Sequence, residues 1–319
     1  MRSLYLRFRL FYMFNKYITA HKPSLQFVVF CALLSLSFLL SSYVMSVLSK
    51  VLIGITIKEM GDLKTIPAHL SNPLKLFNSI FLFSTLFIPA FLFAYLAYPK
   101  PSIYLGLVAP LRKHHLLWGI SIILLAIPFS SLLEEWSRFI PAIGNSKALD
   151  EEYNKLAASM TAGTAPIDLL WNVLAMCLVP AVVEELFFRG CLQQLLLNWM
   201  RKTPLIPIIL VAIIFSAFHG QLSGFFPRLF LGLLLGLVYH YSGSIWICIA
   251  MHFFNNFLTI ILIYLYNTKI IHTDINKLPD MNIVLGVASG AAVMFMLWLF
   301  YHDRKPFEII EVEKEEGLI

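Results

Sequence analysis

Charged residues are scarce in this chain of 319 residues, where they make up 13%, against about 25% in an ordinary soluble domain. Hydrophobic residues make up 59%, and a soluble fold would need more polar surface to cover so large an apolar fraction. Long stretches carry no charge at all, among them 23–49, 76–99, 114–133, 203–227 and 229–268. Because about 20 apolar residues cross a bilayer core of about 30 Å as a helix, each stretch can cross once and the last can cross twice.

Cysteine pairs and basic stripes are also missing. Cys31, Cys177, Cys191 and Cys248 lie in apolar segments without a C-x-x-C spacing, which is typical of small buried hydrophobic residues rather than of a disulfide framework. The net charge is +6, but the basic residues flank apolar spans and form no stripe with interleaved aromatics. The sequence therefore predicts lipid as the surrounding medium and no nucleic-acid partner.

These patterns predict an all-α fold, a polytopic membrane helix bundle of about eight transmembrane helices. The basic first 22 residues and the apolar run after them are interpreted as a retained first span rather than a signal peptide. The segment 134–165 is polar, which predicts a surface helix or a lid. The expected spans are 24–48, 76–98, 114–133, 166–187, 204–222, 225–241, 244–266 and 281–301.

Orientation follows from Lys and Arg in the short loops, which accumulate on the cytoplasmic side of a membrane. The N-terminal segment, the loops at 100–113 and 201–202, and the tail all carry them. Both termini are therefore predicted to lie in the cytoplasm. The compact chain without a targeting leader suggests an integral, multi-pass protein of a bacterial inner membrane.

Ionisable groups inside predicted spans are costly, so each needs a reason. The fourth span contains Glu184 and Glu185, followed by Arg189. Adjacent residues of a helix point about 100° apart, whereas residues i and i+4 share a face. Glu185 can therefore pair with Arg189, which leaves Glu184 free to face something else. A carboxyl group at low dielectric suits a general base or acid near neutral pH.

The fifth span contains Phe215 and His219. The turn between the fourth and fifth spans is predicted near residues 201–203, and Glu184 and His219 each lie 17 residues from Arg201 or Lys202. An antiparallel hairpin therefore brings this carboxylate and this imidazole to a similar depth, where they could hold a water molecule between them.

The seventh span contains His252 and Asn256, four residues apart and on one face. Two neutral donors on one face can stabilise an oxyanion. Alternatively, His252 completes a three-ligand metal site with Glu184 and His219. Depth agrees for all three helices if the hairpin between the fourth and fifth spans extends into the cytoplasm. Asn255 is the substitute for Asn256 if the helix register differs.

At these residues the sequence resembles the CAAX-prenyl protease and bacteriocin-processing proteins, the CPBP family. The family pattern is E-E-x-x-x-R, then F-x-x-x-H, then H-x-x-x-N, and here it reads Glu184-Glu185 with Arg189, Phe215 with His219, and His252 with Asn256. The resemblance covers about 95 residues, from 166 to 260. Residues 1–165 match no family that we could name, and 261–319 contain the end of the seventh span, the last span and the tail.

The resemblance implies an intramembrane endopeptidase that cleaves a peptide or membrane-protein substrate. Glu184 and His219 would activate water, and His252 with Asn256 would hold the oxyanion, while Glu185, Arg189 and Phe215 would support them. The metal-dependent alternative uses Glu184, His219 and His252 as ligands of a divalent ion such as Zn. No cofactor is otherwise expected.

Other protease signatures are missing: the sequence has no H-E-x-x-H, no G-x-S-x-G and no G-x-G-D. Glu134-Glu135 with Arg138 imitates the first motif, but its spacing differs and it is expected to end a helix at the surface. The alternative function is a non-catalytic membrane protein of the same fold, an immunity factor, scaffold or transporter. Such a protein would tolerate replacement of Glu184.

Overall fold

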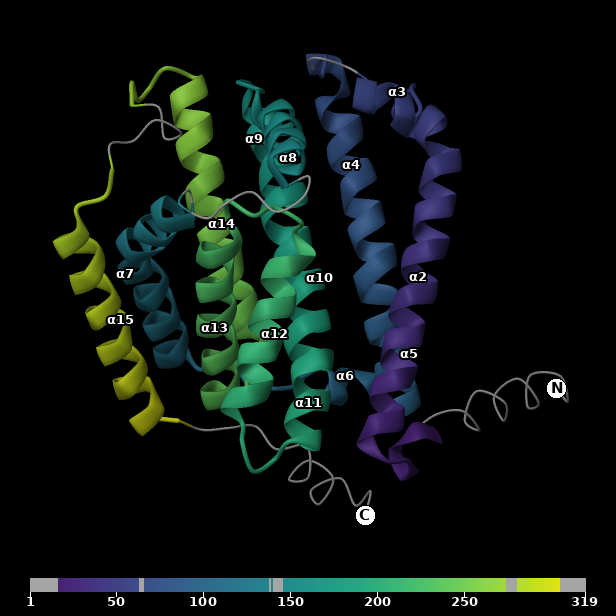
Figure 1. Cartoon of the computed structure of the whole chain (residues 1–319), viewed down its shortest axis with the longest axis vertical. Helices are drawn as coiled ribbons and strands as arrows, with labels where there is room; N and C mark the ends of the chain where they lie inside the picture. The colour runs from purple at the N-terminus through teal and green to yellow at the C-terminus, as the bar shows by residue number, and fades with distance from the viewer. Residues whose placement is uncertain (1–16, 63–65, 138, 140–145, 274–279, 305–319) are drawn as a thin grey trace, which may run out of the picture.

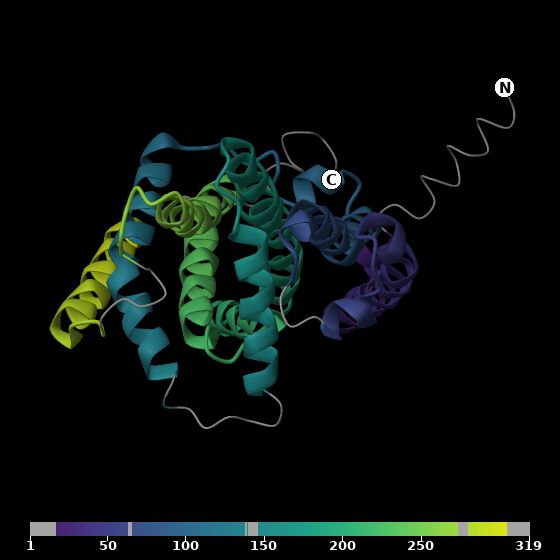
Figure 2. The same cartoon turned by 90° about the horizontal axis from the view of Figure 1, so that it is seen from above.

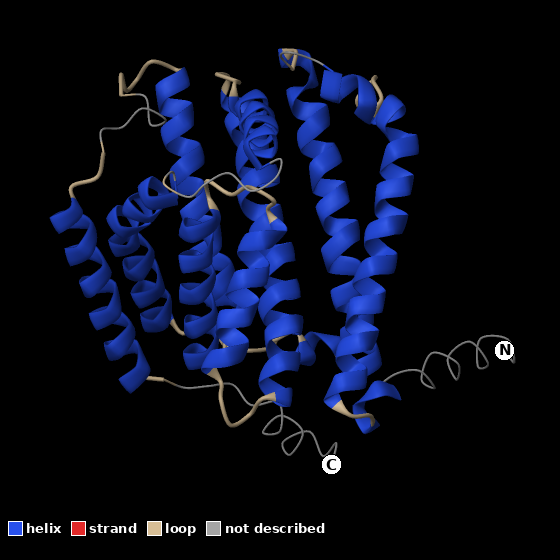
Figure 3. Cartoon of the chain, in the orientation of Figure 1, coloured by secondary structure: helices blue, strands red, loops and turns tan. Residues whose placement is uncertain are grey.

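The computed structural model describes residues 17–62, 66–137, 139, 146–273 and 280–304. Most residues in these ranges are helical, and none of them lies in a strand (Figure 3). The basic N-terminal residues Arg2, Arg7, Arg9 and Lys16, the tail residues Lys305 and Lys314, and Arg138 lie outside the described ranges. The helices are η1 (Tyr17–Ala20), α2 (Pro23–Leu52), α3 (Ile57–Asp62), η2 (Ala68–Leu70), α4 (Ser71–Leu82), η3 (Phe83–Phe87), α5 (Ile88–Ala97), α6 (Pro101–Tyr104), α7 (Lys113–Ser137), α8 (Ser146–Thr161), α9 (Pro166–Asn172), η4 (Val173–Leu178), α10 (Val179–Phe187), η5 (Phe188–Gln193), α11 (Gln194–Trp199), α12 (Leu205–Phe218), α13 (Phe225–Ser242), α14 (Ile245–Asn267) and α15 (Ile283–His302).

Seven helical segments are long and apolar enough to cross a membrane, and α12 is a shorter apolar helix. They run alternately up and down, so that the first described helix begins and α15 ends on the same side of the bundle (Figure 1). Large apolar side chains such as Leu36, Leu39 and Val47 on α2 are exposed, as expected of a surface that faces lipid. The chain is an integral multi-pass membrane protein, and the predicted helical bundle is confirmed.

The fourth span is longer than predicted. Helical residues run from Pro166 to Trp199, twelve residues beyond the expected end at 187. Within it, π-helical turns precede Pro180 and surround Arg189. A proline lacks the backbone N–H that an α-helix needs, and a π turn is one way in which a helix accommodates it. The hairpin made with α12 reaches lower than the turn between α13 and α14 (Figure 1).

The fifth span is shorter than predicted, because α12 ends at Phe218 instead of continuing to 222. Its 14 residues rise only about 21 Å, less than the core of a bilayer. The upper ends of α12 and α13 stop short of the upper ends of α9 and α14 (Figure 1). The connection 219–224 therefore lies within the depth of the bundle, where non-helical backbone must be covered by protein or water.

Helices α12 and α13 pack closely through two glycines of α13. A Cβ atom at Gly232 would lie 3.1 Å from the Cα of Ala212, and one at Gly236 would lie 2.9 Å from Cγ2 of Ile208. Small residues at this spacing let two membrane helices approach closely. This contact fixes α12, which carries Phe215 and His219, against the centre of the bundle.

Helix α8 is the surface helix expected between 134 and 165, and it covers the upper end of the bundle near α9 (Figure 2). Asp150 of α8 accepts hydrogen bonds from the backbone N–H groups of Leu222 (2.9 Å) and Ser223 (3.1 Å). Gln221 donates to Asn154 of α8 (3.1 Å). The polar connection between α12 and α13 is thus covered by α8.

Candidate active site

Three neighbouring helical segments carry the motif residues. Glu184 and Glu185 belong to α10, Phe215 and His219 lie at the upper end of α12, and His252 and Asn256 belong to α14. Apart from His219 and Asn256, which are partly buried, these side chains are buried. Burial removes water from around the charged groups, so each one needs a partner or a function.

Glu185 is fully buried and is shared by two basic groups. Its Oε1 accepts from Nη1 of Arg189 at 2.7 Å, the predicted i, i+4 pair, and it also lies 2.8 Å from Nδ1 of His252. A buried carboxylate is costly unless such partners surround it. The contact between Nδ1 of His252 and the Glu185 carboxylate orients the imidazole ring. It also leaves Nε2 of His252 for another contact.

Arg189 links this carboxylate to the glycine-rich face of α13. Its Nη2 donates to the backbone carbonyl of Gly232 at 3.1 Å, and its guanidinium carbon lies 4.8 Å from the centre of the Phe215 ring. One turn later, Gln193 donates to the carbonyl of Gly236 at 2.9 Å. The close approach of α13 therefore provides the acceptors that a buried arginine and glutamine require.

Phe215 packs edge-on against both histidines of the motifs. Its ring centre is 5.2 Å from that of His219 and 5.9 Å from that of His252. The guanidinium of Arg189 lies over the face of the same ring. Phe215 therefore contacts one residue of the first motif and one residue of the third. A single apolar side chain thus sets the spacing between the two imidazoles.

Glu184 differs from its neighbour in making no side-chain hydrogen bond or ion pair within the described residues, whereas Glu185 uses Oε1 for two partners and leaves only Oε2 without one. Glu184 is 7% exposed, and its Oε2 atom is buried without a hydrogen bond in the described structure. His219 lies close enough to interact electrostatically with Glu184 and with His252. The His219 Nδ1 faces the carbonyl of Phe215 at 2.9 Å, which leaves Nε2 as its second polar atom. The two adjacent glutamates therefore have different surroundings.

Asn256 contacts a different part of the fourth span. Its Nδ2 donates to the carbonyl of Met176 at 3.3 Å, and its Oδ1 accepts from Asn255 at 3.2 Å. An amide nitrogen carries two hydrogens, so one N–H of Asn256 remains for another acceptor. Asn255 lines a cavity of about 240 Å³ between α7, α13 and α14.

Comparison with known families agrees with the motifs. Residues 166–258 match the family model described as Rce1-like, type II CAAX prenyl endopeptidase Rce1-like. This segment is thus similar to the CPBP family, which the motifs also resemble. The match nearly coincides with the residues on which the resemblance was based. No curated protein and no solved structure matches the chain significantly.

The match supports an intramembrane protease of the CAAX type, a kind of enzyme that acts on a peptide, and the seven apolar helices agree with a membrane location. The segment includes α9 to α13 and most of α14, and with them every residue of the three motifs. The π-helical turns at η4 and η5 lie inside it, and such turns are frequent at functional sites.

A metal ion held by Glu184, His219 and His252 stays a prediction. Among the described residues, the His/Cys/Asp/Glu group whose ligand atoms all lie within 4.8 Å of one another is His114, His115 and Asp303, which lies outside the three motifs.

Arg228 is a functional candidate that the motif search missed. It lines the 240 Å³ cavity, donates to the side chain and carbonyl of Gln221 at 2.8 Å each, and interacts electrostatically with Glu184. The sequence held a signal for it, because Arg228 is the only charge between 203 and 268. Asp150 of α8 left no comparable signal, since it belongs to a polar helix in which charges are ordinary.

The imitation motif at Glu134 occupies the end of α7, as expected. Glu134 is exposed and contributes to the rim of the same cavity, and Glu135 accepts a hydrogen bond from the backbone of Met281. Arg138, four residues after Glu134, lies outside the described ranges, so the arginine of this imitation motif has no structural outcome.

Proposed function

We propose that this protein is a glutamate-dependent intramembrane endopeptidase. Glu184 takes a proton from a water molecule that His219 also holds, and the water attacks the peptide carbonyl. The different partners of the adjacent glutamates carry this proposal: Glu185 is paired with Arg189 and His252, whereas Glu184 has no ion-pair partner within the described residues and interacts electrostatically with His219.

The developing oxyanion is stabilised by His252 and Asn256. The Nδ1 of His252 faces Glu185, so its Nε2 can donate to the substrate oxygen. Asn256 contributes the amide hydrogen that Met176 does not use. Donors fixed in advance in a site poor in water stabilise negative charge more strongly than the same donors in water. Glu185 acts through His252 as a positioning residue.

The substrate is a peptide with a lipid-modified C-terminal segment, the class named in the family description. The cavity between α7, α13 and α14 supports this choice, because Leu231, Leu258 and Leu262 line it beside the polar Ser130 and Asn255. An apolar wall with a few polar groups is typical of a ligand site. A peptide in this cavity lies next to Arg228 and Asn255.

The decisive experiment compares purified wild type with Glu184→Gln on a prenylated C-terminal peptide, with Glu151→Gln on the exposed face of α8 as the matched control. We expect cleavage to fall at least about 100-fold in Glu184→Gln, since a general base contributes about 10²–10⁴-fold, and to persist in Glu151→Gln. Cleavage by Glu184→Gln at the wild-type rate would contradict the proposal.

A chelator series addresses the metal alternative in the same assay. We expect a strong chelator of divalent ions to leave the cleavage rate unchanged. Loss of activity that added Zn²⁺ restores would show a metal-dependent protease and would overturn the metal-free mechanism. If neither variant nor wild type cleaves any member of a lipid-modified peptide library, the non-catalytic function is favoured.

A further inference from the structure

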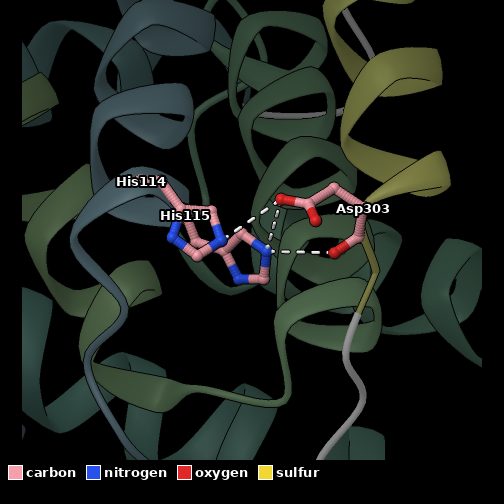
Figure 4. Close-up of side chains that lie close together, drawn as sticks. All are labelled: His114, His115 and Asp303. Atoms are coloured by element: carbon pink, nitrogen blue, oxygen red, sulfur yellow. Dashed lines mark hydrogen bonds and ion pairs between the residues drawn. The ribbon is translucent and has the colours of Figure 1, made fainter.

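A second cluster of ionisable residues lies at the opposite, lower end of the bundle from α8. It consists of His114 and His115, in the first turn of α7, and Asp303, which directly follows α15 (Figure 4). Helix α15 packs along α7, so the cluster closes one end of this helix pair. None of these residues belongs to the three motifs or to the matched family segment.

Both imidazoles point at the same carboxylate oxygen. The Nε2 atoms of His114 and His115 lie 3.2 Å and 3.3 Å from Oδ2 of Asp303, and Nε2 of His115 is also 3.1 Å from the Asp303 carbonyl (Figure 4). Charge-assisted N–H···O bonds are usually about 2.7–2.9 Å long. Tetrahedral zinc with ligands at about 2.0–2.2 Å places neighbouring ligand atoms about 3.3–3.5 Å apart. The observed separations are close to this tetrahedral edge.

The burial of His115 is a second, independent observation. Its ring is completely buried, packs 4.8 Å from the ring centre of Phe300, and has no hydrogen-bond partner at Nδ1. Its polar contacts are thus all made through Nε2, which is aimed into the cluster. The His114 side chain is 50% exposed, so an ion could enter from solvent and keep a water molecule as a fourth ligand.

We propose that His114, His115 and Asp303 bind one Zn²⁺ ion, which joins the beginning of α7 to the end of α15. Two imidazoles and a carboxylate select a transition metal over Mg²⁺ or Ca²⁺, which prefer sites made of oxygen atoms. The ion replaces contacts to a single shared oxygen with a bond to each side chain. This site is separate from the Glu184 and His219 region and does not depend on the proposed protease mechanism.

The test uses untagged full-length protein in detergent, stripped with a chelator and titrated with Co²⁺ as a visible probe of tetrahedral sites. We expect one equivalent of Co²⁺ to bind with tetrahedral absorption bands that Zn²⁺ displaces. His114→Ala and Asp303→Asn should weaken binding by more than about tenfold, because each removes a ligand. His302→Ala is the matched control on the same end of α15, where its Nδ1 faces the carbonyl of Trp298, and should bind as wild type.

Thermal unfolding separates loss of the site from loss of the fold. In chelator, His114→Ala should unfold at the wild-type Tm, because its side chain is half exposed. Zn²⁺ should raise the Tm of wild type and His302→Ala but not of His114→Ala, since a ligand that binds only the folded state stabilises it. The absence of Co²⁺ bands in wild type would overturn the proposal. The proposal would also be overturned if Asp303→Asn bound Co²⁺ as tightly as wild type, or if only Glu184→Gln lost the Co²⁺ absorption bands.

Discussion

At the scale of single residues, two adjacent glutamates have different roles because a helix turns them in different directions. Glu185 meets Arg189 on its own helix and His252 on α14, whereas Glu184 makes no side-chain hydrogen bond or ion pair in the described part of the chain and interacts electrostatically with His219. The same side-chain chemistry is thus structural at one position and proposed to be reactive at the next. The two glutamates cannot exchange their roles, because each role depends on the helix that its side chain faces.

Glu185→Ala should destabilise the protein. The substitution leaves the Arg189 guanidinium fully buried without its carboxylate, and removing one partner of a buried pair costs about 3–5 kcal/mol. We expect a clearly lower Tm in detergent, together with loss of cleavage because His252 is no longer oriented. Glu184→Gln is the matched control and should keep the wild-type Tm. Equal Tm values for wild type and Glu185→Ala would show that the buried pair contributes little.

At the scale of elements, the short helix α12 places His219 inside the bundle instead of at its surface. The connection after it runs through polar residues and is held from above by α8, through Asp150 and the backbone of Leu222 and Ser223. Backbone N–H groups at this depth need acceptors, and a carboxylate provides two. Helix α8 therefore fixes the connection that begins at His219.

Asp150→Ala should lower catalytic efficiency more than stability. Without the carboxylate, the 219–224 connection loses two hydrogen bonds and His219 moves relative to Glu184, and a misplacement of about 1 Å can cost about 100-fold in rate. We expect kcat/KM on a lipid-modified peptide to fall by about tenfold or more. Glu151→Ala, the neighbouring exposed residue on the same helix, should cleave normally. Full activity of Asp150→Ala would exclude this role for α8.

At the scale of the whole molecule, the up-and-down order of the spans places both described ends of the chain on one side of the bundle. The short loops on that side carry Lys100, Arg112, Lys113, Arg201 and Lys202. The opposite side carries acidic residues beside its lysines, as in α8. We propose that the side with the short basic loops is cytoplasmic, in agreement with the positive-inside rule, and that α8 lies on the other face.

Labelling of introduced cysteines tests this orientation. In a Cys31→Ser background, a membrane-impermeant maleimide should label Glu152→Cys in intact cells and Lys202→Cys only after the membrane is permeabilised. Both positions are exposed, and Cys177, Cys191 and Cys248 are buried. The same two variants report both faces, so each serves as the control for the other. The reverse labelling pattern would show that the protein is inserted the other way.

The sequence alone determined that this protein crosses a membrane several times and which helices carry the residues of the three motifs. Apolar length, i, i+4 spacing and the scarcity of charge are local properties, and they predicted the Glu185–Arg189 pair before any coordinates. The extent of the helices was less predictable: α12 ends four residues early and the fourth span ends twelve residues late. Apolar residues continue past 187, so composition does not mark the end of the fourth span, whereas α12 ends at the polar stretch 219–224, where Gly220 has a positive φ.

Only the tertiary structure decided which helix faces meet. It placed Glu185 against His252, 67 residues away, Asp150 against Leu222, and His115 against Asp303 across 188 residues. Such contacts depend on the rotation and tilt of each helix, which are set by packing, for example by the glycines of α13 against Ala212 and Ile208. Periodicity shows which residues share a face of one helix, whereas packing decides which partner that face receives.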